Sequence, residues 1–519
     1  MSQRHVRFNV NELARCAAEA IGAKSCVNIE KYPDGMYNKT MLLTMDNGSQ
    51  VVAKVPNPNA GLPHFTTASE VATMDFAQRV LGTPVPRVLA WSSKAHDNPV
   101  GAEYIIMDKV PGIELERVWP SMDIKDRFAL VKTIAGFQKA WTSVSFKKFG
   151  SLYYANDIDN KSRGSESLYV DAEGNDIKDE KFAIGPSTGR ESIDNGRATI
   201  RFDRGPWSSL EEYHRAIGHR EIACVNQLPQ LPKSPITLCG PGTYQPTRAR
   251  KLSALDCYLK LIRFLLPAAD QAISSAHLWH GDLHVANIFV NPSEPTEVLG
   301  LIDWQSTELS PLYFHARQPY LLDYDGPPLS GLLERPQPPE DMDKLDASVK
   351  KHAETLYLQQ SLCSLYNTLT HRRNPQLYAA LEFQQTTSFL LLLLARNLLI
   401  DGEASYLSQV IDLEATWGQD SCPLPGSKGS SAYPFSFSQA ERDQIKAEAE
   451  GAVRGMNAMQ SIKEALGREL FPEQGIVRAD RYEEALDALS QIKDQVIDEF
   501  ATTEQDREVW QKMWPFGGT

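Results

Sequence analysis

Residues 279–290 read WHGDLHVANIFV, and residues 299–305 read LGLIDWQ. The first stretch carries two histidines, an aspartate and an asparagine ahead of three apolar residues, and the second is an apolar run followed by another aspartate. Two apolar runs joined by a short turn containing proline and serine predict a β-hairpin. We therefore expect the polar loop and the last aspartate to meet at one end of this hairpin.

Asp282 precedes Asn287 by five positions, and Asp303 follows the second strand of the hairpin. Transfer of a phosphoryl group needs a carboxylate that orients the attacking hydroxyl and accepts its proton. It also needs oxygen ligands for Mg²⁺, which bridges the phosphates of the nucleotide. The spacing therefore predicts Asp282 as the general base and Asn287 and Asp303 as magnesium ligands, with His280 bracing the catalytic loop.

The same loop also reads as HxDxH, through His280, Asp282 and His284, which allows a metallohydrolase site for zinc or iron. Such a site needs further ligands and gives no role to Asn287. A D-x-x-x-x-N spacing alone is common by chance, but the ordered set of loop, strand, turn, strand and IDW is far more specific. The phosphoryl-transfer interpretation is therefore the stronger one.

Lys54 lies in the apolar run VVAKV, where a long cation is out of place unless its ammonium group meets anions. A snorkelling or edge-strand lysine is the alternative. Glu70, in the next predicted helix, is the natural partner of Lys54, although Thr67 to Glu70 also fits a capping box in which Glu70 folds back on the helix start. We favour the ion pair, because this helix must pack over the strand that carries Lys54. Lys54 would then clamp the α- and β-phosphates of a nucleotide.

Residues 34–40 (DGMYNKT) follow the first predicted strand, in the position of a loop that covers nucleotide phosphates. They do not form GxGxxG, since Gly35 is the only glycine among them. The backbone amides would need help from the side chain of Tyr37, Asn38 or Lys39. We expect Gly35 and Asn38 to contribute to nucleotide binding.

Residues 103–111 (EYIIMDKVP) predict a core strand that runs into a linker. The backbone of Asp108 and Val110 would meet the edge of the adenine there, beside Met107. An ordinary core strand with a plain connector would show the same pattern, and the two interpretations are compatible.

The residues around these motifs predict an α+β protein with two lobes, like the protein kinases. Alternating β-branched runs, a turn at Asn47-Gly48 and one helical segment indicate a small antiparallel sheet of five strands with one helix. Beyond this sheet, helical periodicity dominates apart from the catalytic-loop hairpin. The parts that we expect are an N-terminal helix (1–23), the N-lobe (24–111), a mainly α-helical C-lobe (112–417) with an insertion at about 150–215, a linker (418–436) and a C-terminal helical extension (437–519).

The composition narrows the class of protein. A net charge of −13 without a dense basic run argues against nucleic-acid binding. The seven cysteines are scattered and never spaced as CxxC, which favours reduced thiols over disulfides or a zinc site. The longest apolar run, residues 389–394, is too short to span a bilayer. We expect a cytoplasmic protein; a mitochondrial location is the alternative, although Glu12 and Glu19 are unusual for a presequence.

With Lys54, Glu70, HGDLHVANIFV and LIDWQ in this order, the chain resembles the aminoglycoside and choline phosphotransferases of the protein-kinase-like superfamily. Runs such as TTASEVATM, NPVGAEYIIM and RGPW are similar to a narrower fungal group, that of altered inheritance of mitochondria protein nine. The resemblance covers residues 9–417. It implies a bilobal fold, ATP and Mg²⁺ in the cleft, and transfer of the γ-phosphate to a hydroxyl group of a small molecule. IDW in place of DFG, and the lack of an APE-like segment, argue against a protein kinase.

The motifs do not identify the acceptor. An amino alcohol, a sugar or an aminoglycoside-like molecule fits the implied chemistry, and the acidic composition favours a cationic one. Candidate contacts are Asp323 and Asp325, together with Arg204, Trp207 and Tyr213 in and after RGPW. A second hypothesis is a non-catalytic kinase-like protein that binds nucleotide or acts as a scaffold, motivated by the atypical phosphate loop and the C-terminal helices.

Overall fold

The computed structural model describes residues 5–33, 35–158, 166–268, 271–324, 326–339, 346–429, 432–471, 477 and 481–516. The chain packs into two compact units. The first unit consists of Met1–Ile193, Arg204–Tyr213 and Pro267–Gln385. The second unit consists of Asp194–Asp203, His214–Leu266 and Thr386–Thr519. Every candidate site residue that the structure describes belongs to the first unit.

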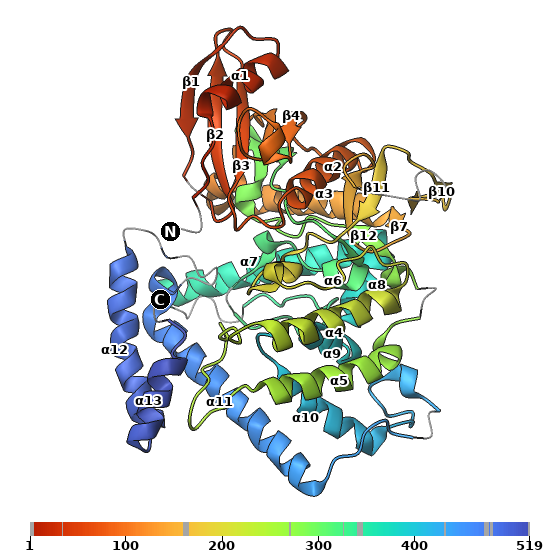
Figure 1. The fold of residues 1–519 in the computed structure, drawn as a ribbon, viewed down its shortest axis with the longest axis vertical. Coiled ribbons are helices and arrows are strands. Elements are labelled where there is room, and N and C mark those ends of the chain that lie inside the picture. Colours follow the sequence, from red (N-terminus) through yellow and green to blue (C-terminus); the bar gives the residue numbers. More distant parts are fainter. Residues whose placement is uncertain are drawn as a thin grey trace. The chain divides into compact units, whose positions relative to one another are not determined.

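The first unit begins with an antiparallel sheet of five strands, in the order β1-β2-β3-β5-β4 (Figure 1). Its strands are β1 (Cys26–Lys31), β2 (Asn38–Met45), β3 (Gln50–Pro56), β4 (Val88–Ser92) and β5 (Tyr104–Asp108). Gly48 turns the chain between β2 and β3 with a φ of 82°, a conformation that glycine adopts without strain. The five-stranded antiparallel sheet predicted from the sequence is confirmed, and β3 lies at its centre.

Helices α1 (Val10–Ala20) and α2 (Phe65–Arg79) pack against strands of this sheet. Asn9 caps α1, because its side-chain oxygen accepts hydrogen bonds from two amides of the first turn. The buried face of α1, around Leu13 and Ala17, belongs to the same hydrophobic core as strands β2, β3 and β5. The helix predicted as a separate N-terminal part is therefore a layer of the N-lobe, since its apolar stripe completes the core of the sheet.

The linker after β5 contains a short strand that pairs with the hairpin after the predicted catalytic loop. Strands β6 (Ile113–Glu114), β13 (Ile288–Asn291) and β14 (Glu294–Leu301) form an antiparallel sheet in the order β14-β13-β6. Two glycines allow the close approach: a Cβ at Gly112 would lie 2.2 Å from the Val290 carbonyl oxygen, and a Cβ at Gly300 would lie 2.5 Å from the Val110 side chain. The hairpin predicted from the sequence is confirmed.

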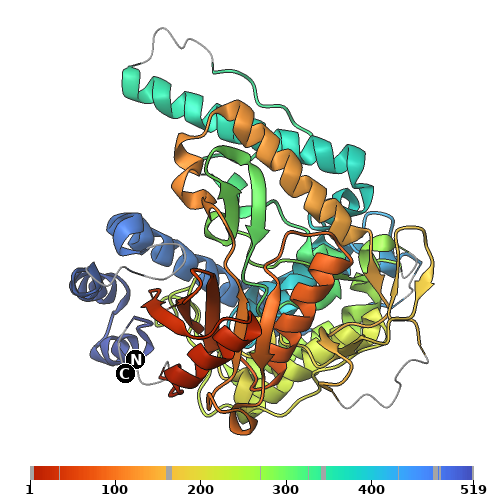
Figure 2. The same ribbon diagram turned by 90° about the horizontal axis from the view of Figure 1, so that it is seen from above.

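Helices make up most of the rest of the first unit, with two small sheets. The helices are α3 (Ile124–Thr142), α6 (Leu312–His315), α7 (Ala347–Arg373) and α8 (Pro375–Phe383). The orange helix α3 packs along the turquoise helix α7 (Figure 2). The sheets have the orders β10-β9-β7-β12-β15 and β11-β8. Their strands are β7 (Ser145–Phe146), β8 (Ser151–Tyr154), β9 (Tyr169–Val170), β10 (Asp176–Ile177), β11 (Phe182–Gly185), β12 (Ala276–Leu278) and β15 (Leu309–Pro311), of which β8 to β11 belong to the predicted insertion.

The second unit is helical. Its helices are α4 (Leu210–Gln227, from His214 on), α5 (Arg248–Leu265), α9 (Thr387–Ala395), α10 (Glu403–Leu413), α11 (Gln439–Leu470), α12 (Tyr482–Phe500) and α13 (Glu504–Met513). Leu238 is fully buried in one core with Trp510 and the inner faces of α11 and α12. The boundaries predicted at 417 and 437 do not coincide with the edges of the compact units, because the loop around Leu238 supplies core residues to the C-terminal helices.

Candidate active site

Two consecutive elements, β3 and α2, and a segment 249 residues further along the chain meet at Lys54. This residue lies on the central strand β3, and it is 6% exposed. Its Nζ donates to Glu70 Oε1 on α2 at 2.6 Å and to Asp303 Oδ1 after β14 at 2.8 Å. Burial alone would lower the pKa of Lys54, but the two carboxylates outweigh it and raise this pKa above its usual value. Lys54 is therefore a buried, charged group and not a snorkelling lysine at a sheet edge.

Glu70 pairs with Lys54 and takes no part in a capping box. Helix α2 begins at Phe65 with His64 as its N-cap, so Thr67 is already inside the helix. Burial raises the pKa of the Glu70 carboxyl, and the ammonium group of Lys54 opposes this shift. Of the two arrangements that the sequence allows, the structure has the ion pair.

Asp303 has a left-handed backbone conformation, with a φ of 64°. Such a conformation costs roughly 1–3 kcal/mol for a residue other than glycine, and it is common at functional sites. The side chain is 37% exposed even though one oxygen contacts Lys54. Burial opposes ionisation of Asp303, but the ammonium group of Lys54 outweighs it and holds the pKa of this carboxyl below its usual value. Asp303 is therefore an ionised and accessible carboxylate.

His280 ties the catalytic loop to the end of β14. Its Nε2–H donates to the carbonyl oxygen of Ile302 at 2.8 Å, and its Nδ1 accepts from the amide of Asp282 at 3.3 Å. These two contacts require the neutral ring with its proton on Nε2, and burial lowers the pKa of His280 in the same sense. The Ile302 amide donates in turn to the carbonyl oxygen of Asn287 at 3.0 Å. His280 thus braces the loop against the residue that precedes Asp303.

Asn287 and Asp282 present different atoms from this loop. Asn287 is 7% exposed, and its Nδ2 donates to the carbonyl oxygen of Asp282 at 2.9 Å. This bond turns the amide so that Oδ1 is the atom left for a cation. The Asp282 side chain is 61% exposed, and its Oδ2 lies 3.5 Å from His284 Nε2. The loop can therefore offer a carboxylate to an incoming hydroxyl and an amide oxygen to a metal ion.

The contact between Asp282 and His284 gives a first testable prediction. The hydrogen bond with Asp282 raises the pKa of His284, against the opposing effect of burial. In Asp282→Asn we expect this pKa to fall towards about 6.5, the value of an unperturbed imidazole. Because the folded pKa is raised, the pair stabilises the protein below about pH 6.5, and this contribution is lost as the pH rises through the folded pKa. A titration of the His284 ring followed by NMR measures this pKa. An unchanged pKa in the variant would show that Asp282 is not the cause of the raised pKa of His284.

The geometry of the described residues gives no support to the HxDxH alternative. Among the residues that the structure describes, no three His, Cys, Asp or Glu side chains come together in a group that could hold a metal ion. His280 is turned towards Ile302, and His284 Nδ1 accepts from the amide of Ala286 at 3.3 Å. The two histidines therefore support the loop and do not converge on one point.

Side chains hold the predicted phosphate loop between β1 and β2. The Gly35 amide donates to the carbonyl oxygen of Asn38 at 3.2 Å, and a Cβ on Gly35 would make only ordinary contact. Asn38 Nδ2 donates to Gln305 Oε1 of the LIDWQ motif at 2.7 Å. The guanidinium group of Arg190, from the insertion, lies over the ring of Tyr37, 4.1 Å from its centroid. The loop is thus fixed from the catalytic motif and from the insertion.

Arg190 and Gln305 were not predicted as site residues. Arg190 donates to the carbonyl oxygens of Asn59 and Ala60 at 3.1 and 3.0 Å, and Gln305 Nε2 donates to Ala60 at 2.9 Å. Gln305 could have been found from the sequence, because it ends the LIDWQ motif. Arg190 could not, since it lies in an insertion without a motif and contacts the loop only in the folded protein.

The linker offers fewer backbone groups to an adenine than the sequence suggested. The Asp108 amide donates to the carbonyl oxygen of Arg87 at 3.0 Å, so this amide is not available to a ligand. Val110 is 9% exposed, and its amide donates to no described residue. A backbone N–H of a nearly buried residue rarely stays without an acceptor. Val110, beyond Met107 at the end of β5, is therefore the best placed donor of the linker.

The acceptor contacts suggested by the sequence have other partners. Trp207 and Tyr213 are 9% and 3% exposed, and their rings pack edge to face. Arg204 donates to a backbone carbonyl oxygen of the insertion at 2.5 Å. Asp323 forms an ion pair of 3.1 Å with an arginine six residues earlier. Two further positions named from the sequence, Asp34 and Asp325, lie outside the described residues.

A comparison with known families agrees with this geometry. A family model described as the phosphotransferase enzyme family, APH, matches residues 28–314. The chain belongs to this phosphotransferase family. The matched span is more than half of the 519 residues and contains Lys54, Glu70, the catalytic loop and Asp303. The family expected from the motifs is therefore confirmed.

Curated fungal relatives share much of the chain. A subtelomeric hrmA-associated cluster protein of Aspergillus fumigatus is 28% identical over 521 residues, which cover 95% of this chain and 97% of that protein. Altered inheritance of mitochondria protein 9, mitochondrial, of Yarrowia lipolytica is 27% identical over 339 residues, which cover 60% of this chain and 56% of that protein. The narrower resemblance to this fungal group is thus confirmed.

Solved structures of phosphotransferases also match this chain. A macrolide 2′-phosphotransferase from Brachybacterium faecium is 13% identical with a TM-score of 0.28, and the match covers 75% of this chain and 98% of that one. The gentamicin–APH(2″)-IIa complex is 13% identical with a TM-score of 0.33, and the match covers 75% and 99%.

Proposed function

We propose that the protein transfers the γ-phosphate of ATP to a hydroxyl group of a small molecule. The observation that carries this proposal is the buried Lys54, which contacts Glu70 at 2.6 Å and Asp303 at 2.8 Å. Catalysis of phosphoryl transfer rests mostly on positioning and charge neutralisation. A fixed cation beside an accessible carboxylate, next to a loop that carries Asp282, supplies both.

Different residues would bind the nucleotide and the acceptor. Lys54, kept in place by Glu70, would contact the α- and β-phosphates. The Val110 amide and the Asp108 carbonyl group would meet the adenine. Asp282, which is 61% exposed, would orient the acceptor hydroxyl and take its proton.

The donor set near the hairpin fits Mg²⁺, because this cation prefers carboxylate and amide oxygens. Asp303 supplies an accessible carboxylate with a lowered pKa, and Asn287 supplies its Oδ1. When held by Asp303 and Asn287, Mg²⁺ would supply positive charge that neutralises part of the charge of the nucleotide phosphates. Because Lys54 Nζ contacts Oδ1 of Asp303, the second oxygen of this carboxylate is the one open to a cation.

The magnesium assignment predicts a change in ligand-dependent stability. We expect ATP with Mg²⁺ to raise the Tm of the full chain more than ATP with EDTA does, since a ligand at about 100 times its Kd adds about 2.7 kcal/mol. Asp303→Asn should lose the Mg²⁺-dependent part of this rise. Asp323→Asn is the matched control, because its side chain is 59% exposed and is paired outside the site. A full Mg²⁺ effect in Asp303→Asn would refute the assignment.

The acceptor class is tested by ADP release. A panel of amino alcohols, sugars and aminoglycosides is incubated with the full chain, ATP and Mg²⁺, and ADP is measured with and without each alcohol. We expect acceptor-dependent ADP release that is lost in Asp282→Asn. A Tm rise with ATP and Mg²⁺ but no turnover on any acceptor would favour a non-catalytic nucleotide-binding protein, and no Tm rise would count against both.

The compartment needs its own experiment. The sequence favours the cytoplasm, whereas the name of the Yarrowia relative includes the word mitochondrial. No single described helix is long and apolar enough to cross a membrane, and α8 and α9 meet that test only as a bent pair. Fractionation of cells that make the tagged full chain decides between cytoplasm and mitochondrion.

A further inference from the structure

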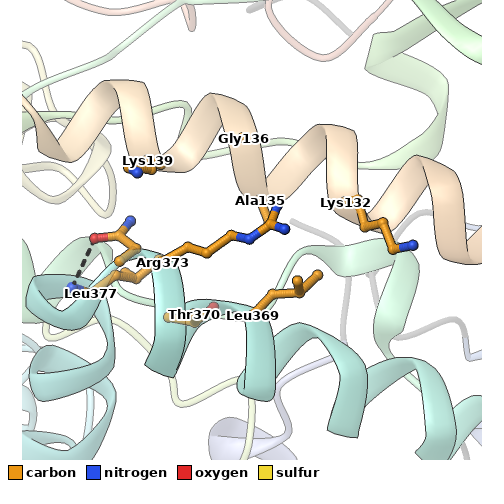
Figure 3. Close-up of a pocket in the computed structure, with 9 residues that line it drawn as sticks. Lys132, Ala135, Gly136, Lys139, Leu369, Thr370, Arg373 and Leu377 are labelled. Carbon is orange, nitrogen blue, oxygen red and sulfur yellow. Dashed lines mark hydrogen bonds between the residues drawn. The ribbon is translucent and has the colours of Figure 1, made fainter.

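A hollow of about 140 Å³ lies between α3 and the junction of α7 with α8 (Figure 3). It shares no lining residue with the site around Lys54. The end of α7 supplies Arg373, whose side chain reaches towards Ala135 on α3. The same helix α3 supplies Lys132 and Lys139.

The lining is cationic and carries no carboxylate among the described residues. Lys132, Lys139 and Arg373 all belong to it, and none of the three forms an ion pair with a described residue. This concentration of positive charge contrasts with the net charge of −13 of the whole chain. Two of these cations, Lys139 and Arg373, lie on the side of the hollow next to Asn374, whereas the side chain of Lys132 points away from Arg373 (Figure 3). Cations without a described counter-charge favour an anionic ligand.

Asn374 adds a buried donor that has no partner. The residue is 6% exposed and lies at the N-cap of α8. Its Oδ1 accepts from the amide of Leu377 at 3.3 Å and from Thr142 Oγ1 at 3.0 Å, which fixes the orientation of the amide. Its Nδ2 then finds no acceptor among the described residues. A buried donor left without an acceptor costs about 1–3 kcal/mol, and an anion in the hollow would satisfy it.

Apolar side chains form the rest of the lining. Ala135, Leu369 and Leu377 belong to it, and a Cβ on Gly136 would meet nothing within 4 Å. The hollow therefore has room for an apolar group beside the charged end of a ligand.

A second hollow of about 460 Å³ adjoins the first and shares Lys139, Arg373 and Asn374 with it. One carboxylate, that of Asp171, lies along this second hollow. It already accepts three hydrogen bonds from the turn that contains Asn175. Lys139, Arg373 and Asn374 therefore line both hollows, and an anion in either hollow would contact them.

The hollow is separate from the phosphotransfer site. Trp141 of α3 packs on Trp279 and Trp304, which flank the catalytic loop and Asp303, with ring centroids 5.1 and 5.8 Å apart. Lys139 and Thr142, three residues apart on one side of the same helix, are directed to the hollow and to Asn374. The last turn of α3 thus contacts the two sites with different side chains.

We propose that this hollow binds the phosphate group of a small phosphate monoester, with the apolar part of the ester against Leu369 and Leu377. A phosphate monoester carries a charge of about −1.5 to −2 at pH 7 and three acceptor oxygens. Lys139, Arg373 and the Asn374 amide match that charge and number of acceptors better than they match a carboxylate. Arg373 supplies the planar, two-pronged donor that phosphate recognition favours.

The test uses the full chain and phenyl phosphate as the probe. Its binding is measured by calorimetry and by Tm at constant ionic strength, with phenol and sodium chloride as the comparisons. We expect phenyl phosphate alone to bind and to raise the Tm. Lys139→Gln with Arg373→Gln should weaken binding by roughly tenfold or more, because two charge-assisted hydrogen bonds are lost. Arg372→Gln, an exposed neighbour in the same turn of α7, is the matched control and should keep the affinity of the wild type.

Other sites and sources are distinguished by further variants. Binding that persists in Lys139→Gln with Arg373→Gln but disappears in Lys54→Met with Glu70→Gln would place the probe at the phosphotransfer site and overturn the proposal. Equal loss in Arg372→Gln would reduce the effect to overall charge and overturn it as well. Sedimentation with phosphatidylcholine vesicles that contain phosphatidate, lost only in the Lys139 and Arg373 variant, would support the site and assign the phosphate to a lipid headgroup.

Discussion

Asp282→Asn should lower kcat by about 100- to 10,000-fold with ATP, Mg²⁺ and a cognate acceptor, which is the range that a positioned general base contributes. The asparagine can still accept a hydrogen bond from the hydroxyl group, but it cannot take the proton. KM for ATP should change little, because the proposed nucleotide contacts are those with Lys54 and the linker. Steady-state kinetics over a range of ATP and acceptor concentrations separate the two parameters.

The fold should not suffer from this substitution. Asp282 is 61% exposed, and its pair with His284 is of the surface type that contributes about 0–1 kcal/mol. Asp256→Asn is the matched control, because Asp256 is also 61% exposed and pairs with Lys260 within one helix. Both variants should unfold in urea at nearly the same midpoint as the wild type, while only Asp282→Asn loses activity. A kcat within a few fold of the wild type would remove Asp282 from the role of base.

The parts of the site that the sequence could predict are those that short-range patterns determine. The hairpin register follows from two apolar runs and one turn, so Asp303 could be placed beside Asn287 without any coordinates. Lys54 was conspicuous because a charge inside an apolar strand needs a partner. Its second contact, with Asp303, was not predicted. That contact depends on how the hairpin of one lobe meets the sheet of the other, which no local pattern encodes.

Long-range packing also explains the other differences. Arg190 meets Tyr37 across 153 positions of sequence, and nothing in the insertion marks that arginine. Helix α1 was predicted as a separate part because the sequence shows its apolar face. The sequence does not show which face of the sheet that helix covers. The backbone of Asp108 was expected to meet the adenine, but its amide donates to the carbonyl oxygen of Arg87, which directly precedes strand β4. Backbone partners of this kind can be assigned only when the strand order is known.

Lys54→Met should abolish activity and also weaken the fold. Removing one partner of a buried ion pair leaves the other charge without compensation, at a cost of about 3–5 kcal/mol. Glu70, with a side chain 2% exposed, would then be the uncompensated group. Urea unfolding measures the loss of stability, and turnover of ATP with an acceptor measures the loss of activity.

The double variant Lys54→Met with Glu70→Gln separates the two effects. Replacing both charges by neutral groups of similar volume is often close to neutral for stability, so we expect the double variant to regain most of the free energy of unfolding and none of the activity. Recovery of activity together with stability would mean that Lys54 acts only through the fold. If the double variant stays as unstable as Lys54→Met, the uncompensated Glu70 is not the cause of the loss.

The pH dependence of the single variant gives an independent check. Without Lys54, burial raises the pKa of Glu70 above its unfolded value of about 4.3, so the folded state keeps a proton that the unfolded state releases. The stability of Lys54→Met should therefore fall as the pH rises from about 4.3 through the folded pKa of Glu70. The double variant has no carboxyl at this position and should lack that fall. The same slope in both variants would show that another group titrates, and the pairing of Lys54 with Glu70 would then not account for the instability.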